Sequence, residues 1–190
     1  EGMAVKKILV TGAYGLIAGA VFRHLHERTN KYDVYGLARR RHASDRASKT
    51  AGDIPEERFF LADLTNLSAL EKAMRGVDVV VQLAADPRPD ASWESVLGNN
   101  IVGVRNVFEA AHRCGVKRVV FASSIMVSWG YQQEDPYKAI SEGRFDDVIP
   151  SELHTVTHAW SHRPTGLYPA SKVWGEALAR YYSDVHNMSV

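Results

Sequence analysis

The stretch TGAYGLIA, residues 11–18, is the most informative part of this 190-residue sequence. It follows a short apolar run from Lys6 to Thr11 that indicates a buried strand, and it opens a segment with apolar residues at helical spacing. A glycine turn between a first strand and a first helix is where a dinucleotide-binding fold holds a pyrophosphate. Gly12 permits the tight turn, Gly15 lets the backbone approach the anion, and the helix start points its free N–H groups at it.

A small residue, Ala18, stands where the usual pattern has its third glycine, and it still allows close packing of helix on strand. The loop lies between a strand and a helix at the start of the chain, which favours nucleotide binding over a purely structural turn. The loop residues that we expect to contact a cofactor are Gly12, Tyr14, Gly15, Leu16 and Ile17.

Strand-like and helix-like segments alternate along the rest of the chain. Further strands are predicted at Val34–Ala38, Phe59–Leu61, Val77–Ala84 and Arg118–Ser123. Helices are predicted at about Gly15–Arg28, Leu67–Met74, Ser92–Arg113 and Tyr168–Asp184. This alternation is typical of α/β proteins and predicts a doubly wound parallel sheet, the Rossmann fold. Residues 188–190 resemble the start of a sixth strand.

One long segment interrupts the alternation. From about residue 130 to residue 166 the chain carries Pro136, Pro150 and Pro164, many polar residues and weak periodicity. Such a segment is too long for an ordinary connection between a strand and a helix. We therefore expect residues 1–190 to form one nucleotide-binding domain with an insertion or active-site flap at about 130–166.

The composition excludes several classes of partner. With 45% hydrophobic residues, 24% charged residues and a formal net charge of +1, the chain is ordinary for a globular protein and offers no electrostatic case for nucleic acid or an anionic membrane. No apolar run approaches the roughly 20 residues of a membrane helix, and no signal peptide is visible. The single cysteine, Cys114, fits a reducing compartment. We expect a cytoplasmic protein.

Three histidines with a regular spacing raise the question of a metal site. His154, His158 and His162 are four residues apart and would share one face of a helix. The residues between them are poor helix formers, and no nearby cysteine or acid completes a ligand set. We therefore expect no metal site.

The end of the second strand carries a clue to the cofactor. An NAD site usually has an acid there for the ribose hydroxyls, whereas this strand runs into Arg39-Arg40-Arg41. Asp33 precedes the strand and belongs to its other edge. A guanidinium binds phosphate with bidentate geometry, so Arg39 suits the extra 2′-phosphate of NADP. The sequence favours NADP over NAD, with a solvated basic turn as the alternative.

Tyr168 and Lys172 are spaced so that they share one face of a predicted helix. A nearby ammonium favours the phenolate, which would let Tyr168 take a proton from a substrate hydroxyl while hydride leaves for a nicotinamide. Such a pair alone is common by chance. Ser124 adds weight because it follows the fifth strand, at the edge where open α/β sheets build their sites, and its hydroxyl could bond the substrate oxygen.

Taken together, these motifs resemble the extended short-chain dehydrogenase/reductases, also called the NAD-dependent epimerase/dehydratases. The resemblance extends over nearly the whole chain and rests on motifs in the family's order, namely residues 11–18, Asp63-Leu64, Leu83 to Ala85, Asn100, Ser124 and Tyr168 to Lys172. It implies an oxidoreductase or epimerase that acts on a hydroxyl of a sugar or sugar nucleotide.

The resemblance also implies roles for the matched positions. Asp63 and Leu64 would flank the adenine, and Leu83, Ala84 and Ala85 would pass under the pyrophosphate and ribose. Asn100 would belong to the long helix behind the site. The catalytic set would be Ser124, Tyr168 and Lys172, with Lys172 and Tyr168 also contacting the cofactor.

Two stretches, residues 100–103 and 121–124, look like the uronate dehydrogenases of this family. Those enzymes tend to follow the serines with polar Asn-His, whereas Ile125-Met126 follow here. Residues 34–40 are similar to NADP-dependent reductases of the superfamily. Family members often form homodimers through the two long helices, and they usually continue into a C-terminal substrate-binding part, which is missing from these residues. The alternative function is a dinucleotide-binding module without turnover, such as a sensor, scaffold or truncated remnant.

Overall fold

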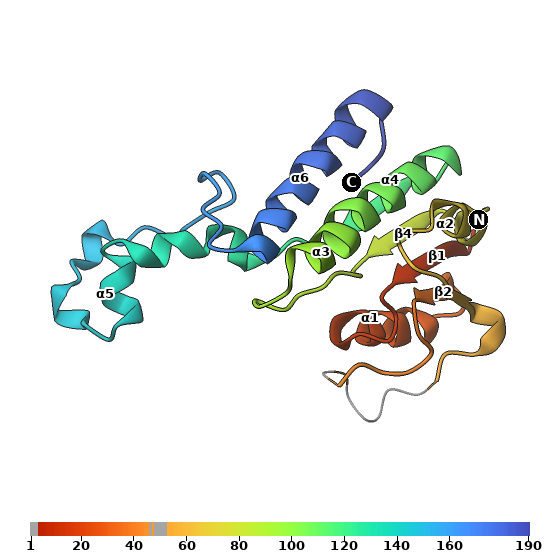
Figure 1. Ribbon diagram of the computed structural model, residues 1–190, viewed down its shortest axis with the longest axis horizontal. Helices are drawn as coiled ribbons and strands as arrows, with labels where there is room; N and C mark the ends of the chain where they lie inside the picture. The colour runs from red at the N-terminus through yellow and green to blue at the C-terminus, as the bar shows by residue number, and fades with distance from the viewer. Residues whose placement is uncertain (1–3, 46, 48–52) are drawn as a thin grey trace.

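The computed structural model describes residues 4–45, 47 and 53–190 and contains one parallel sheet of five strands (Figure 1). The strands are β1 (Lys6–Thr11), β2 (Tyr32–Ala38), β3 (Phe59–Leu61), β4 (Val79–Gln82) and β5 (Arg118–Phe121). Their order is β3-β2-β1-β4-β5, so the chain reverses direction across the sheet between β1 and β4. This is the doubly wound sheet that the sequence predicted, and its crevice opens at the carboxyl ends of β1 and β4.

Helices cover both faces of the sheet. α1 (Leu16–His26) lies on one face, while α2 (Leu67–Met74), α4 (Gly103–Arg113) and α6 (Leu167–His186) lie side by side on the other (Figure 1). The side chains of β1 alternate accordingly, since Ile8 and Val10 pack in the cluster around Phe22 of α1, whereas Leu9 packs in the cluster around Phe108 of α4. Burial on both faces explains why β1 reads as a continuous apolar run.

The predicted helix over residues 92–113 is interrupted by a π-helical segment. The chain is helical from α3 (Trp93–Val96) through the π-helical η2 (Leu97–Val102) into α4. The sequence did not predict this change of pitch, which places the side chain of Asn100 against the loop that follows β4. π-helical turns of this kind occur frequently at functional sites.

Two strands are shorter than predicted at their carboxyl ends. β4 ends at Gln82 rather than Ala84, because the N–H groups of Leu83 and Ala84 donate to the Thr11 hydroxyl instead of a neighbouring strand. β5 ends at Phe121 rather than Ser123. At the other edge of β5, Ser189 forms a parallel bridge with Arg118, as the predicted start of a sixth strand would.

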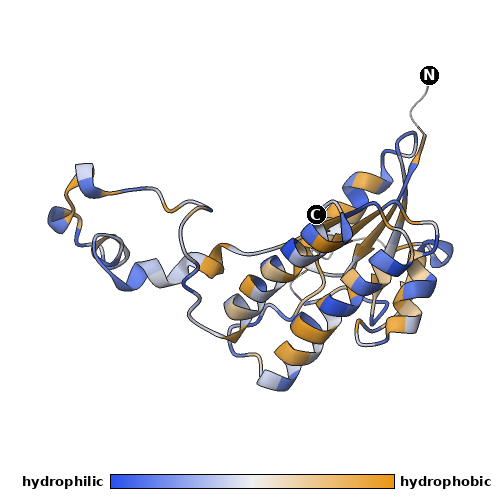
Figure 2. Cartoon of the chain, turned by 90° about the horizontal axis from the view of Figure 1, so that it is seen from above, coloured by the Kyte–Doolittle hydropathy of each residue, from blue (hydrophilic) through white to orange (hydrophobic). Residues whose placement is uncertain are grey.

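Residues 125–166 form an arm that extends away from the sheet (Figures 1 and 2). It contains short helices, namely η3 (Ile125–Gln133), α5 (Tyr137–Ser141), η4 (Phe145–Asp147) and η5 (Pro150–Glu152). Two backbone bonds of 2.8 Å close its base, from Gly130 N to Arg163 O and from Arg163 N to Val127 O. The insertion expected at about 130–166 lies within this arm, and its role as a flap stays a prediction.

None of the helices in the described part of the chain is both long and apolar enough to cross a membrane.

Close packing of α6 on β5 depends on one glycine. A Cβ atom placed on Gly175 would lie 2.3 Å from the ring of Phe121, a distance that no side chain tolerates. Because Gly175 lies one turn beyond Lys172, the same approach brings the lysine to the carboxyl end of β5. The glycine is therefore needed for the distance between helix and sheet.

We expect Gly175→Ala to lower the free energy of unfolding by about 1–3 kcal/mol, as overpacked core positions do. Gly98→Ala is the matched control, because Gly98 is also helical and a Cβ there meets nothing within 4 Å. The control should be neutral or slightly stabilising, since alanine favours helix over glycine. Urea unfolding followed by circular dichroism measures both variants, and equal stabilities would contradict the packing argument.

Candidate active site

The glycine loop leaves room for an anion at the start of α1. Gly12 has a φ of +70°, and a Cβ there would lie 3.0 Å from the Cα of Ala84. The loop is closed by a 2.7 Å bond from Gly15 N to Gly12 O. Among the described residues, no side chain caps the first turn of α1, so its N–H groups can donate to a ligand. The loop thus fits the pyrophosphate of a dinucleotide.

Other side chains of the loop divide between core and surface. The Tyr14 ring packs edge-on against Phe59 with centroids 5.3 Å apart, and its hydroxyl accepts a bond from Ile54 N. Only the backbone of Tyr14 therefore faces the loop. Leu16 and Ile17 are 50% and 66% exposed at the start of α1, where apolar side chains can cover a bound cofactor.

Thr11 joins the two strands that border the crevice. Its buried hydroxyl donates to Gln82 Oε1 over 2.6 Å and accepts bonds of 3.1 Å from the N–H groups of Leu83 and Ala84. The segment Leu83–Ala85 is thereby held beside the glycine loop. This role of Thr11 and Gln82 was not predicted from the sequence, although two polar residues at the ends of apolar strands are a signal for such a contact.

At the ends of β2 and β3 the structure brings Arg39, Asn99 and Asp63 together. Arg39 Nη1 donates to Asn99 Oδ1 over 3.4 Å. The backbone N–H of Thr65 holds the pKa of the Asp63 carboxyl below its usual value, with Arg39 as a smaller contribution. Leu64 is buried against α4, and it fits there because Gly103 has no side chain. These residues can border an adenosine.

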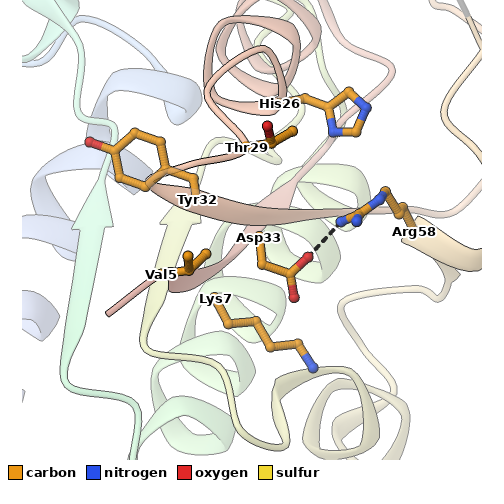
Figure 3. Close-up of a pocket in the computed structure, with 7 residues that line it drawn as sticks. All are labelled: Val5, Lys7, His26, Thr29, Tyr32, Asp33 and Arg58. Atoms are coloured by element: carbon orange, nitrogen blue, oxygen red, sulfur yellow. Dashed lines mark hydrogen bonds and ion pairs between the residues drawn. The ribbon is translucent and has the colours of Figure 1, made fainter. Parts of the chain in front are cut away.

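The opposite edge of the sheet holds a separate cavity of about 380 Å³, which opens beside Lys7, His26 and Tyr32 (Figure 3). Asp33 points across it to Arg58, at 2.6 Å. Asp33 therefore lies at the amino end of β2, as expected, and away from the glycine loop. The cavity and the crevice lie at opposite ends of β1.

Lys172 is the buried charge of the site. It is only 5% exposed, and its ammonium donates to the carbonyl of Ala122 over 2.8 Å. The ammonium lies 5.7 Å from the ring centroid of Tyr168 and 5.1 Å from that of Phe121. Burial lowers the pKa of Lys172 to about 8. At neutral pH it still carries a proton beside Tyr168, which is half-buried.

Ser124 lies just beyond β5, near this lysine. Its hydroxyl accepts a 3.2 Å bond from Met126 N and so caps η3. Lys172 contacts Ala122, two residues before Ser124, and Ser123 donates to Glu176 of α6. The end of β5 and the first half of α6 are thus joined at two points.

Asn100 connects the loop after β4 to the start of α6. It is buried, exchanges two bonds with the backbone of Asp86, and donates to Ser171 Oγ over 3.1 Å. Ser171 in turn donates to the carbonyl of Tyr168 over 2.6 Å. The asparagine therefore positions the helical turn that carries the tyrosine.

The three histidines of the arm do not share a helix face. Residues 153–163 are irregular, and His162 instead pairs with Glu176 at 2.7 Å. Within residues 4–45, 47 and 53–190, no three histidine, cysteine or acidic side chains are placed to hold a metal ion.

Comparison with known proteins places this geometry in context. Residues 8–190 match the model of the NAD dependent epimerase/dehydratase family. The NAD-dependent glucose-6-phosphate dehydrogenase of Haloferax volcanii is 38% identical over 187 residues, which are 96% of this chain and 65% of that protein. An L-arabinose 1-dehydrogenase (NAD(P)(+)) of the same organism is 38% identical over 130 residues, 68% of this chain and 48% of that protein.

Among solved structures, a mutant uronate dehydrogenase from Agrobacterium tumefaciens complexed with NAD superposes with a TM-score of 0.70 at 28% identity. The match covers 96% of this chain and 57% of that one. The chain therefore spans about half to two thirds of the length of these relatives.

The burial of Lys172 predicts an unusual titration. In a chain whose lysine ε-carbons are labelled with carbon-13, the resonance of Lys172 is the one that disappears in Lys172→Met. This resonance should titrate near pH 8. The unfolded chain keeps the proton up to a higher pH, so the parent should gain stability relative to Lys172→Met as pH rises from about 8 to 10. Titration of this resonance above pH 10 would show that the ammonium is solvated.

Proposed function

Since the chain belongs to the NAD-dependent epimerase/dehydratase family, we propose that it binds a nicotinamide dinucleotide and oxidises a hydroxyl group of a sugar derivative. The observation that carries this proposal is the placement of Lys172. An ammonium is buried beside Tyr168 and bonded to Ala122, at the same edge of the sheet as the glycine loop. A buried cation beside a tyrosine is costly for stability and useful for proton transfer.

In this proposal the dinucleotide lies across the carboxyl ends of β1 and β4. The free N–H groups at the start of α1 hold its pyrophosphate, while Gly12 and Gly15, whose own N–H groups bond Leu37 O and Gly12 O, leave room for it. Asp63 and Leu64 border the adenine, Leu83–Ala85 pass beneath the ribose, and Asn100 supports that segment. When bound, the nicotinamide supplies a hydride acceptor.

The side chains at the start of α6 then handle the proton. Tyr168 takes the proton of the substrate hydroxyl, and the ammonium of Lys172 favours the resulting phenolate. Ser124 donates a hydrogen bond to the substrate oxygen. Lys172 also bonds the nicotinamide ribose. An epimerase would use the same three residues to remove and return the hydroxyl proton, while the nicotinamide would accept and return the hydride.

The names of the relatives offer a guide to the substrate. These relatives act, by their names, on glucose 6-phosphate, L-arabinose and uronate. We therefore propose a sugar of one of these three kinds as the substrate. We also propose a homodimer formed through the long helices that contain α4 and α6, the assembly that the family resemblance implies. A dinucleotide-binding module without turnover is the alternative.

Within the proposal, Arg39 selects NADP over NAD. It stands at the carboxyl end of β2, and no acid lies beside it on the strand. Arg41 is turned away to Glu56 at 3.2 Å, whereas Arg39 is turned toward Asn99 and Asp63. A 2′-phosphate there would replace a long hydrogen bond to the neutral Asn99 amide with a bond between opposite charges.

Calorimetric titration with NADPH and NADH tests the cofactor. We expect the chain to bind NADPH more tightly than NADH. Arg39→Ala should weaken the affinity for NADPH by roughly ten- to hundredfold and leave the affinity for NADH unchanged. Arg41→Ala, the paired arginine two residues away, should change neither affinity. Equal affinities in the parent would remove the preference for NADP but keep the dinucleotide site. Absence of binding to either would overturn the proposed function.

Turnover separates the enzyme from the module. With glucose 6-phosphate, glucuronate or L-arabinose and the oxidised form of the preferred dinucleotide, Tyr168→Phe should lower kcat by about 10²–10⁴-fold, and the variant should still bind the dinucleotide. Tyr181→Phe is the matched control, since Tyr181 lies on the same helix and contacts His186 instead of the site. Equal background rates in the parent and Tyr168→Phe would support the module.

A further inference from the structure

The loop after β4 carries an arginine held rigidly by a buried carboxylate. Asp86 has a side chain 6% exposed, whereas that of Arg88 is 61% exposed. Arg88 donates from Nε to Oδ1 over 3.0 Å and from Nη2 to Oδ2 over 2.7 Å. Both bonds of this fork are charge-assisted, so the plane of the guanidinium is fixed relative to the loop.

Asp86 has no acceptor capacity to spare for a ligand. Besides the fork it accepts bonds from Arg88 N over 3.2 Å and from Ser95 Oγ over 2.5 Å. A carboxylate offers about four acceptor sites, and all four are used here. The Arg88 guanidinium also holds the pKa of the Asp86 carboxyl well below its usual range, so the fork persists at any working pH. The Asp86 carboxylate is therefore fully used in bonds to Arg88 and Ser95, and it fixes the orientation of Arg88.

The opposite edge of the guanidinium remains available. Nη1 and the second hydrogen of Nη2 form no hydrogen bond with any described residue. Two parallel donors on a guanidinium edge match the oxygens of a phosphate or carboxylate. Asp90, two residues further on, interacts with Arg88 only through longer-range attraction and partly offsets its charge.

The start of this loop is linked by hydrogen bonds to the helical turn that carries Tyr168. The loop starts where Leu83–Ala85 leave β4, and Asn100 bonds both the Asp86 backbone and Ser171. Ser171 holds the carbonyl of Tyr168. A network of buried hydrogen bonds therefore fixes the start of the loop that carries Arg88 to the helical turn that carries Tyr168, the proposed general base.

We propose that Arg88 binds the anionic group, phosphate or carboxylate, of the substrate, with Asp86 and Ser95 as positioning residues. This assignment rests on the proposed function. It gives the substrate a direction, because the anion lies at the Arg88 loop while the reacting hydroxyl lies at Tyr168. Neutral sugars lack a partner for the guanidinium edge and should bind more weakly.

The test is calorimetric titration of the chain, saturated with its preferred dinucleotide, with glucose 6-phosphate, glucuronate and glucose. One of the two anionic sugars should bind more tightly than glucose, which identifies phosphate or carboxylate as the group. Arg88→Gln should weaken the affinity for that anionic sugar by roughly ten- to hundredfold and leave the affinity for glucose unchanged. Arg113→Gln is the control, because the Arg113 side chain is also about half exposed and pairs with Glu109 on α4 and Glu71 on α2.

Two further variants keep the test decisive if Arg88→Gln disturbs the loop. Arg88→Lys retains the charge without the fork and should fall between the parent and Arg88→Gln. Asp90→Asn should tighten binding of the anionic sugar. Two outcomes would overturn the assignment of Arg88 while leaving the proposed function intact. In one, the chain binds the dinucleotide but binds neither anionic sugar more tightly than glucose. In the other, the tighter binding of the anionic sugar persists in Arg88→Gln. A parent that binds no dinucleotide would instead overturn the proposed function.

Discussion

The hydroxyl of Thr11 is the contact on which the geometry of the crevice depends. It donates a hydrogen bond to Gln82 and accepts hydrogen bonds from the N–H groups of Leu83 and Ala84. These bonds hold the carboxyl ends of β1 and β4 together at the point where the strand order reverses. Because the hydroxyl takes over the backbone donors beyond Gln82, β4 stops there and the chain turns across the glycine loop. A single polar side chain thereby decides where strand pairing ends and ligand contact can begin.

The start of α6 shows how the packing of a helix places a charge. Gly175 lets the helix approach Phe121 closely, and the approach carries Lys172 to a carbonyl at the end of β5. An ammonium with one carbonyl partner and little solvent is unfavourable for folding, and its lowered pKa expresses that cost. Such a placement is rare for purely structural lysines, which keep their ammonium in water.

Polar groups buried between β4 and α6 link the two halves of the crevice. Asn100 projects from a π-helical turn to reach both Asp86 and Ser171, and the Arg88 loop begins at the same asparagine contact. A fully bonded network of this kind rigidifies its neighbours, because any displaced member would leave a buried polar group unpaired. The arm of residues 125–166 lies outside this network and closes on itself through Val127, Gly130 and Arg163.

The sequence by itself determined the class of fold, because periodicity and glycine punctuation are local properties. Strands β1 and β3 and helix α2 have the predicted bounds, and the order of elements was enough to predict a doubly wound sheet. It also marked the residues proposed for the glycine loop and for the Ser124, Tyr168 and Lys172 set. Only the tertiary structure decided that Thr11 binds the end of β4, that Asp86 orients Arg88, and that the helix before α4 widens at Asn100. The partners of Thr11 and Asn100 lie more than 70 residues away in the sequence, and Arg88 lies only two residues from Asp86. In each case packing, and not spacing along the chain, brings the bonded atoms together.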